Sequence, residues 1–163
     1  MTNNNSKIRF MCQSAVIAAL YASLTLFVNA FGLANGAIQV RLSEALCILP
    51  VFTPSAVGGL FLGCIIANLL CASPVWDIAF GSLATLIGAY LTYRMRNIRY
   101  KTLCTLPPVL SNAIIIPFVL KLVYKLDGAY WYFFATVGLG ELISCTVVGM
   151  LFYKLLYPHR NKL

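Results

Sequence analysis

The sequence predicts an all-α integral membrane protein, a bundle of six transmembrane helices in which residues 1–163 form a single domain. The chain is 61% hydrophobic and only 10% charged, with a mean hydropathy of +0.86. A water-soluble domain carries roughly a quarter charged residues, so too few polar side chains are present to cover a soluble globule. We attribute the net charge of +8 to basic cytoplasmic loops, and nucleic acid is not an expected partner.

Long apolar runs locate the predicted spans. A helix needs about 20 mostly apolar residues to cross the hydrocarbon core, and the runs near 8–31, 77–93, 102–125 and 130–157 approach or reach this length. The run at 42–72 is too long for one span. Pro50 and Pro54 interrupt it, because proline lacks a backbone N–H and disfavours helix before it. We therefore predict two helices there, at 42–52 and 54–72, which makes six.

The distribution of basic residues supports an even number of spans. With six, the N-terminus, the loop at 94–101 and the C-terminal tail share one side of the membrane, whereas five would separate the first two. Because cytoplasmic segments are rich in Lys and Arg, we expect a multi-pass cell-membrane protein with both termini in the cytoplasm. That side holds nine of the twelve basic residues: Lys7, Arg9, Arg94, Arg96, Arg99, Lys101, Lys154, Arg160 and Lys162.

Two polar residues fall inside predicted spans. Glu141 lies within the last span and Asn112 midway along the fifth. An ionisable side chain at bilayer depth costs several kcal/mol unless it is paired or solvated by a cavity, so Glu141 is a candidate site residue. The alternatives are that Glu141 pairs with Arg41 or Lys121, or is a protonated packing acid, and that Asn112 forms an interhelical hydrogen bond.

Further polar residues lie near the outer ends of the predicted spans. Trp76 and Asp77 begin the fourth span, where the alternatives are an interfacial aromatic anchor and a helix-capping acid. Polar residues that come from separate helices and share the outer half of the membrane are what an outward-facing pocket needs. We therefore predict a substrate-binding site formed by Arg41, Glu44, Asn68, Trp76, Asp77, Asn112 and Glu141.

Arg41 and Glu44 stand three residues apart at the start of the second predicted helix. If this helix extends back to Arg41, the two share a face; otherwise Glu44 occupies the first turn, where the helix dipole favours an anion. The preceding segment 32–40, "GLANGAIQV", is a candidate lid, and the alternative is an ordinary exposed loop with a surface ion pair. We interpret Arg41 and Glu44 as marking the entrance to a binding chamber.

Small residues recur every four positions on two of the predicted helices. Such columns allow helix backbones to approach closely. For the column on the third helix we expect packing within the bundle, and for the two columns on the first helix a docking face for another subunit is an equal alternative. The columns are Gly59, Gly63 and Ala67 on the third helix, and Ser14, Ala18 and Ala22 beside Ala15, Ala19 and Ser23 on the first.

Several chemistries are disfavoured by the motifs that the sequence lacks. The six cysteines form no CxxC pair, and the single histidine, His159, lies in the tail. Thiols inside apolar segments act as small hydrophobes, so we expect neither a metal nor another cofactor. There is also no G-x-x-x-x-G-K-[ST] phosphate loop, no HExxH motif and no Ser/His/Asp set. We therefore expect a protein that is not an enzyme and has no ATPase motif of its own.

Three segments resemble a known family. They are "VRLSEALCILPVFTPSAVGGLFLGCIIAN", "DIAFGSLATLIGAYLT" and "LPPVLSNAIIIP", and they look like the QueT family of substrate-binding S components of energy-coupling factor (ECF) transporters for queuosine precursors. The resemblance implies capture of a ligand at the outer face and delivery inward after docking on an ECF module, a membrane subunit (EcfT) with two ATPases. The family's docking motif, alanines four apart on the first helix, matches Ala15, Ala18, Ala19 and Ala22.

The ligand implied by this resemblance is a 7-deazaguanine: the aminomethyl form preQ1, the cyano form preQ0, or queuine. A carboxylate accepts the N–H donors of a guanine-like edge in pairs, and an amide serves its carbonyl group. We expect a carboxylate at the guanine edge, an amide at the carbonyl group, an acid at a cationic aminomethyl group and an aromatic ring stacked on the base. The candidates are Glu141 or Glu44 for the guanine edge and Asn112 or Asn68 for the carbonyl group. Asp77 is the candidate for the aminomethyl group, and Trp76 or another aromatic residue for stacking.

Three rival functions fit the same sequence. A stand-alone proton-coupled permease for a small metabolite would use Glu141 as its proton carrier. A structural subunit would have a packing pocket and no ligand. A small membrane enzyme is the third. Loss of uptake when the proton gradient is dissipated would indicate the permease. Binding of a deazaguanine to the purified protein would exclude the structural subunit. Product formation without partners would indicate the enzyme.

Overall fold

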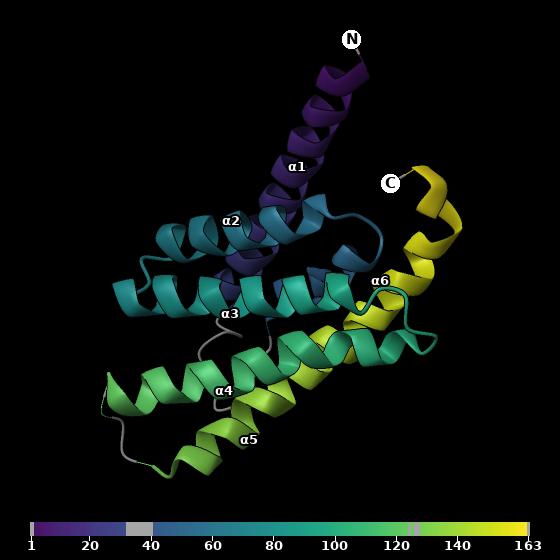
Figure 1. The fold of residues 1–163 in the computed structure, drawn as a ribbon. Helices are drawn as coiled ribbons and strands as arrows, with labels where there is room; N and C mark the ends of the chain where they lie inside the picture. Colours follow the sequence, from purple (N-terminus) through teal and green to yellow (C-terminus); the bar gives the residue numbers. More distant parts are fainter. Residues whose placement is uncertain (1, 32–40, 124, 126–127, 163) are drawn as a thin grey trace.

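The computed structural model describes residues 2–31, 41–123, 125 and 128–162, and this part of the chain is helical without a strand. Each long helix packs on its neighbour in sequence, α1 on α2, α2 on α3, α3 on α4 and α4 on α5 (Figure 1). The elements are α1 (Thr2–Ala30), η1 (Leu42–Val51), α2 (Ser55–Leu70), α3 (Val75–Arg94), η2 (Lys101–Thr105), α4 (Leu106–Leu122), α5 (Tyr130–Glu141), η3 (Leu142–Val148), α6 (Gly149–Leu156) and η4 (Tyr157–Lys162).

Four helical segments of the described chain are long and apolar enough to cross a membrane: Asn4–Ala30, Val75–Arg94, Lys101–Leu122 and Tyr130–Leu156. They coincide with four of the six predicted spans, so the prediction of an all-helical multi-pass membrane protein is confirmed. Large apolar side chains cover the outside of the bundle, for example Phe118 and Trp131, which are 50% and 73% exposed. Membrane lipid is the environment that such a surface requires.

The other two predicted spans are shorter than a bilayer. The 16 residues of α2 rise ~24 Å at 1.5 Å per residue, and the 10 residues of η1 rise ~20 Å as a 3₁₀ helix. The hydrocarbon core is about 30 Å thick. Every residue from Ser43 to Pro50 is buried, and η1 contacts α1, α3, α6 and η3. The predicted second span is therefore an internal helix enclosed by the others.

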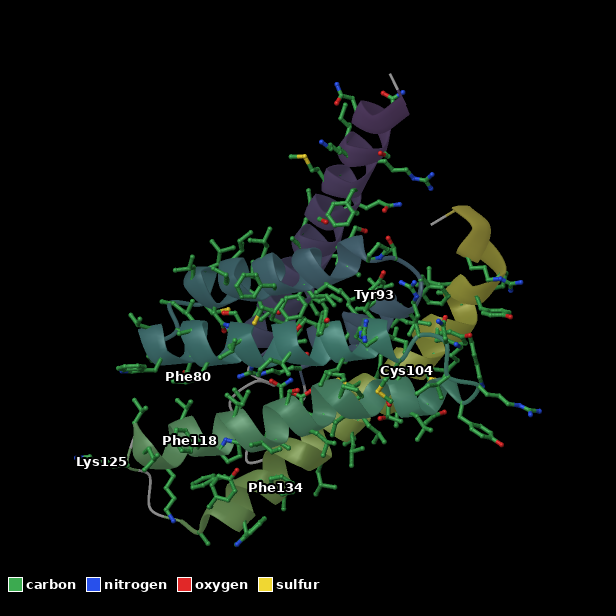
Figure 2. All side chains as sticks on the ribbon, in the orientation of Figure 1. Phe80, Tyr93, Cys104, Phe118, Lys125 and Phe134 are labelled. Carbon is green, nitrogen blue, oxygen red and sulfur yellow. The ribbon has the colours of Figure 1, made fainter. Side chains whose placement is uncertain are left out.

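The two ends of the bundle differ in charge. Figure 2 shows Tyr93 and Cys104 at the end that also carries the C-terminus, and Lys125 at the opposite end. The basic loop at 94–101 lies at the first of these ends, between α3 and α4, whereas the turn between α2 and α3 lies at the other. The sequence therefore places most of its basic residues at one end of the folded molecule.

Glycines bring α1 and α2 into backbone contact. A Cβ atom added at Gly63 would lie 2.8 Å from the Tyr21 Cβ atom and 2.9 Å from the Ala18 carbonyl oxygen, and one at Gly59 would lie 2.7 Å from the Ser14 carbonyl oxygen. The column on α2 thus packs inside the bundle, as expected. Because Tyr21 sits in this contact, the close approach of α1 and α2 also fixes the position of its side chain.

We predict that Gly63→Ala lowers the stability of the protein, because its methyl group would force α1 away from α2. Overpacking of this kind costs about 1–3 kcal/mol. Thermal unfolding of the purified protein in detergent measures the effect. Gly58→Ala is the matched control on the same helix, since nothing lies within 4 Å of a Cβ atom there. Equal melting temperatures for the two variants would contradict the packing argument.

Candidate functional site

A cavity of about 310 Å³ opens between α1, α2 and the beginning of α3, at the end of the bundle that carries the α2–α3 turn. Its size falls at the lower limit of pockets that bind small molecules. Three of the predicted site residues, Arg41, Asn68 and Asp77, line it. The other lining residues are Tyr21, Thr25, Val28, Asn29, Leu42, Ser43, Cys64, Ala67, Cys71, Ala72, Ser73 and Pro74.

Short-range hydrogen bonds position Asn68 at the cavity wall. Its Nδ2 atom donates to the Cys64 Sγ atom at 3.4 Å, and its Oδ1 atom accepts from the Ser73 hydroxyl group at 3.5 Å. The contact with Ser73 is at the long limit for a bond between two oxygen atoms, whereas 3.4 Å is an ordinary distance to the larger sulfur atom. The Oδ1 atom of Asn68 is therefore held weakly and keeps capacity for a further partner.

Two carboxyl groups meet in the interior beside this cavity. Glu44 of η1 is 0% exposed and Glu141 at the end of α5 is 3% exposed. An oxygen of each lies within 4.8 Å of the other and of the Cys145 Sγ atom. We call Glu44, Glu141 and the neighbouring Asn112 the acid centre. No salt bridge to either carboxyl group occurs among the residues that the structure describes, so the predicted pairing of Glu141 with Arg41 or Lys121 is not seen there.

The Glu44 carboxyl group is held by side chains from three elements. The Tyr21 hydroxyl group of α1 donates to Oε1. The Thr85 hydroxyl group of α3 shares its proton between the same atom, at 3.3 Å, and the Gly81 carbonyl oxygen, at 3.0 Å. The Cys47 thiol donates to Oε2 at 3.0 Å. Arg41 makes a backbone contact only, accepting a hydrogen bond from the Glu44 N–H group at 2.9 Å. Hydroxyl and thiol donors thus fix Glu44, which occupies the first turn of η1, the second of the two alternatives. Glu44 lies in the interior, so the interpretation that it marks an entrance is wrong.

Asn112 carries the clearest unmet hydrogen-bonding capacity of the described residues. It is 0% exposed, and neither its Nδ2 nor its Oδ1 atom has a hydrogen-bond partner. Its amide group nevertheless lies beside the Glu141 carboxyl group. Buried polar atoms are almost always hydrogen-bonded, so this amide keeps both a donor and an acceptor available for a ligand at the acid centre.

A π-helix follows Glu141 directly. The segment η3 continues α5 with widened turns, and it places the Cys145 thiol 3.3 Å from the Glu141 Oε2 atom and 3.4 Å from the Glu44 carbonyl oxygen. π-helical turns are rare and occur frequently at functional sites. The distortion brings a residue of the last helical segment into contact with η1, which lies about a hundred positions earlier in the chain.

Tyr21 separates the cavity from the acid centre. It lines the cavity, and its hydroxyl group donates to Glu44. Cys64 also lines the cavity, and its Sγ atom lies 3.6 Å from the hydroxyl group of Thr85, which contacts Glu44. The cavity and the acid centre are therefore adjacent, with the Tyr21 ring between them.

The structure divides the predicted site residues into two groups and leaves one outside. Arg41, Asn68 and Asp77 lie at the cavity, whereas Glu44, Asn112 and Glu141 form the acid centre. Trp76 lines neither: it is 53% exposed and stacks on Phe80 with ring centroids 6.0 Å apart, in keeping with the alternative of an interfacial anchor. The candidate lid at 32–40 lies outside the described residues.

The sequence did not point to Tyr21, to Thr85 or to the two thiols that contact the carboxyl groups of the acid centre. Tyrosine, threonine and cysteine are common in apolar helices, and only their convergence on Glu44 and Glu141 distinguishes these four from the rest. The spacing of Glu44 and Cys47 by three residues in η1 was the available signal. The residues concerned are Tyr21, Cys47, Thr85 and Cys145.

The alanine columns of α1 face in different directions. Ala18 and Ala22 are 5% and 6% exposed, and Ala18 lies in the α1–α2 contact. Ala15 and Ala19 are exposed. Only the second pair can form part of a docking face, so the prediction that all four contact another subunit is corrected: Ala18 and Ala22 are buried in the chain's own bundle.

Comparison with known proteins gives two matches. The family model of the QueT transporter matches residues 11–158. The queuosine precursor transporter QueT of Lactococcus lactis subsp. cremoris (strain MG1363) is 36% identical over 74 residues, which make up 45% of this chain and 43% of that protein. The aligned part therefore covers less than half of the curated relative. No solved structure matches the chain significantly.

We predict that Tyr21→Phe destabilises the protein, because it removes the hydroxyl donor from a fully buried carboxyl group. An unsatisfied buried acceptor costs about 1–3 kcal/mol. Thermal unfolding in detergent measures the loss, and Tyr90→Phe on α3 is the control because Tyr90 is 52% exposed. If both variants had the melting temperature of the wild-type protein, the Tyr21–Glu44 hydrogen bond would have no part in holding α1 to η1.

Proposed function

Because this chain belongs to the QueT transporter family, we propose that it is the substrate-binding component of an ATP-driven ECF-type importer and captures a 7-deazaguanine queuosine precursor. The observation that carries the proposal is the acid centre, where Asn112 lacks any hydrogen-bond partner beside Glu141. The name of the Lactococcus lactis relative, a queuosine precursor transporter, supports the same substrate class.

The donor and acceptor pattern of a 7-deazaguanine fits the acid centre. Its N–H edge presents two donors to one carboxylate, and its carbonyl oxygen accepts from an amide N–H group. We assign the edge to Glu141 and the carbonyl oxygen to Asn112. A ligand bound in this way supplies the partners that the Asn112 amide lacks. Glu44 then accepts from the remaining N–H donors of the ring.

We further propose that the ligand enters through the cavity and that Tyr21 turns to admit it. Tyr21 is the only aromatic residue among those that line the described cavity, so it replaces Trp76 as the candidate for stacking on the ring. Asp77 lies at the cavity wall, where its carboxylate suits the cationic aminomethyl group of preQ1. Asn68 and Arg41 provide further polar contacts at the entrance.

The orientation of the molecule supports capture from outside. The cavity opens at the end of the bundle opposite to the basic loop at 94–101. Cytoplasmic loops are rich in Lys and Arg, so we propose that both termini are cytoplasmic and that the cavity faces the exterior. Six passages of the chain, with η1 and α2 counted as short ones, agree with this arrangement.

Coupling to ATP hydrolysis requires partners in this proposal. The sequence contains no phosphate-loop motif, so an EcfT subunit with two ATPases would supply the energy. The exposed pair Ala15 and Ala19 provides a surface on α1 without large side chains, which suits close contact with a helix of EcfT. The buried pair Ala18 and Ala22 is excluded from this role.

A stand-alone proton-coupled permease is the second candidate function. Two carboxyl groups that lie within 4.8 Å in the interior are suited to hold and release one proton, because like charges at such a distance do not ionise together. Uptake that stops when the proton gradient is dissipated at constant ATP would favour this candidate. Uptake that continues favours the ECF-type importer.

We predict that Glu141→Gln weakens binding of preQ1 to the purified protein by about 10- to 100-fold, the loss of a charged hydrogen bond worth about 1.5–3 kcal/mol. Isothermal titration measures the dissociation constant. Thr136→Val on the same helix is the control, since its hydroxyl group bonds only to the Phe133 carbonyl oxygen at 3.1 Å. Unchanged affinity in Glu141→Gln would remove Glu141 from the site.

We predict that Ala19→Leu leaves ligand binding intact but reduces uptake by cells that contain the ECF module at least tenfold, because a bulky side chain separates helices that must approach closely. Ala135→Leu, an equally exposed position on α5, should transport normally. Ala18→Leu should instead destabilise the isolated protein, since Ala18 is buried against α2. Normal uptake by Ala19→Leu would exclude this face from docking.

A further inference from the structure

We propose that Glu44, Glu141 and Cys145 form a binding site for one divalent cation of the zinc class when no deazaguanine is bound. The cation and the deazaguanine proposed above would compete for Glu44 and Glu141, so the site goes beyond the transport function. The sequence does not suggest it, because the only histidine lies in the tail and no CxxC pair is present. The fold creates it by joining η1 to the π-helix η3.

The donor atoms lie at distances close to those around a single metal ion. The Cys145 Sγ atom is 3.3 Å from the Glu141 Oε2 atom. One atom from each of Glu44, Glu141 and Cys145 fits within a mutual separation of 4.8 Å. In a tetrahedral zinc site with bonds of ~2.0–2.3 Å, adjacent ligand atoms are separated by about 3.3–3.8 Å.

The types of donor select the class of cation. Two carboxylates alone would suit Mg²⁺ or Ca²⁺, but thiolates favour Zn²⁺ and cations of similar softness. Zn²⁺ accepts a mixed set of sulfur and oxygen ligands in four-coordinate geometry. The Cys145 thiol therefore favours zinc over the hard cations.

The charge of the acid centre favours a cation. Both carboxyl groups are almost fully buried, and ionised groups in such surroundings require a compensating charge. The Arg41 guanidinium group is close enough to attract them, but among the described residues it forms no salt bridge with either. A dication bound to both carboxylates and to the Cys145 thiolate leaves one negative charge, which the nearby Arg41 guanidinium group offsets.

The surrounding polar groups are arranged as an outer shell. Tyr21 and Thr85 both contact the Oε1 atom of Glu44, and the Cys47 thiol donates to its Oε2 atom. Hydrogen bonds of this kind orient metal ligands. The Asn112 amide is fully buried beside Glu141 and has no hydrogen-bond partner. It is a second observation that points to a bound group, and its N–H donors would orient a metal-bound Glu141.

Titration of the purified full chain with Co²⁺, after treatment with a chelator, tests the site. We expect one tightly bound equivalent with a sulfur-to-cobalt charge-transfer band in the near ultraviolet, which Zn²⁺ abolishes by displacement. Cys145→Ser should lower the Co²⁺ affinity at least tenfold and remove the band or weaken it. Cys104→Ser is the matched control, because this cysteine is equally buried but bonds to the Met95 carbonyl oxygen elsewhere in the bundle.

A second variant distinguishes loss of the metal site from a folding defect. Glu141→Gln keeps both thiols and should also lower the affinity at least tenfold, and thermal unfolding without metal establishes that each variant is folded. The absence of saturable Co²⁺ binding to the wild-type protein, or an unchanged band in folded Cys145→Ser, overturns the proposal. The assay contains no deazaguanine, so its failure is distinct from a failure of the proposed transport function.

Discussion

The Glu44 carboxyl group lies at the centre of an apolar bundle, and the arrangement of the helices around it follows from the need to satisfy its oxygen atoms. Tyr21 of α1 and Thr85 of α3 both donate to Oε1, and Cys47 donates to Oε2. A buried acid without such donors is costly. The same hydrogen bonds that make Glu44 tolerable thus tie η1 to α1 and α3, so the stability of the fold and the geometry of the site have a common origin.

Close packing of small residues makes this arrangement possible. Gly63 lets α2 approach the backbone of α1 beside Tyr21, and Gly88 does the same for α3 and α4, where an added Cβ atom would lie 2.6 Å from the Pro108 Cα atom. Without strong hydrophobic attraction between helices in lipid, such contacts are a main source of association. These contacts bring the side chains of the acid centre close together, although none of the described residues forms an ion pair with its carboxyl groups.

Much of the fold was accessible from the sequence, because long apolar runs and their flanking charges are local signals. The four long spans were located in this way, and the two prolines separated η1 from α2. Two features were not accessible. The enclosure of η1 depends on contacts with six other elements, α1, α2, α3, α6, η2 and η3. The division of the α1 alanines depends on which face of α1 turns towards Gly63. Two site residues, Glu141 and Asn112, were recognisable in the sequence because lipid does not accommodate their polar side chains. Tyr21 and Cys145 were not recognisable, because their role depends on contacts with Glu44, which is distant in sequence.

The widened turns of η3 have a consequence for the comparison of related chains. In an α-helix each residue advances the side chains by about 100° around the axis, and a π-helical turn holds one residue more than an α-helical turn. Residues before and after 142–148 therefore follow different angular registers: Glu141 and Gly149 both face η1, and an added Cβ atom at Gly149 would lie 3.3 Å from the Ala45 carbonyl oxygen. A relative that lacks the extra residue must either turn its glutamate away from the bundle axis or rotate its C-terminal helix, so a single-residue gap at this point in an alignment marks a change of architecture.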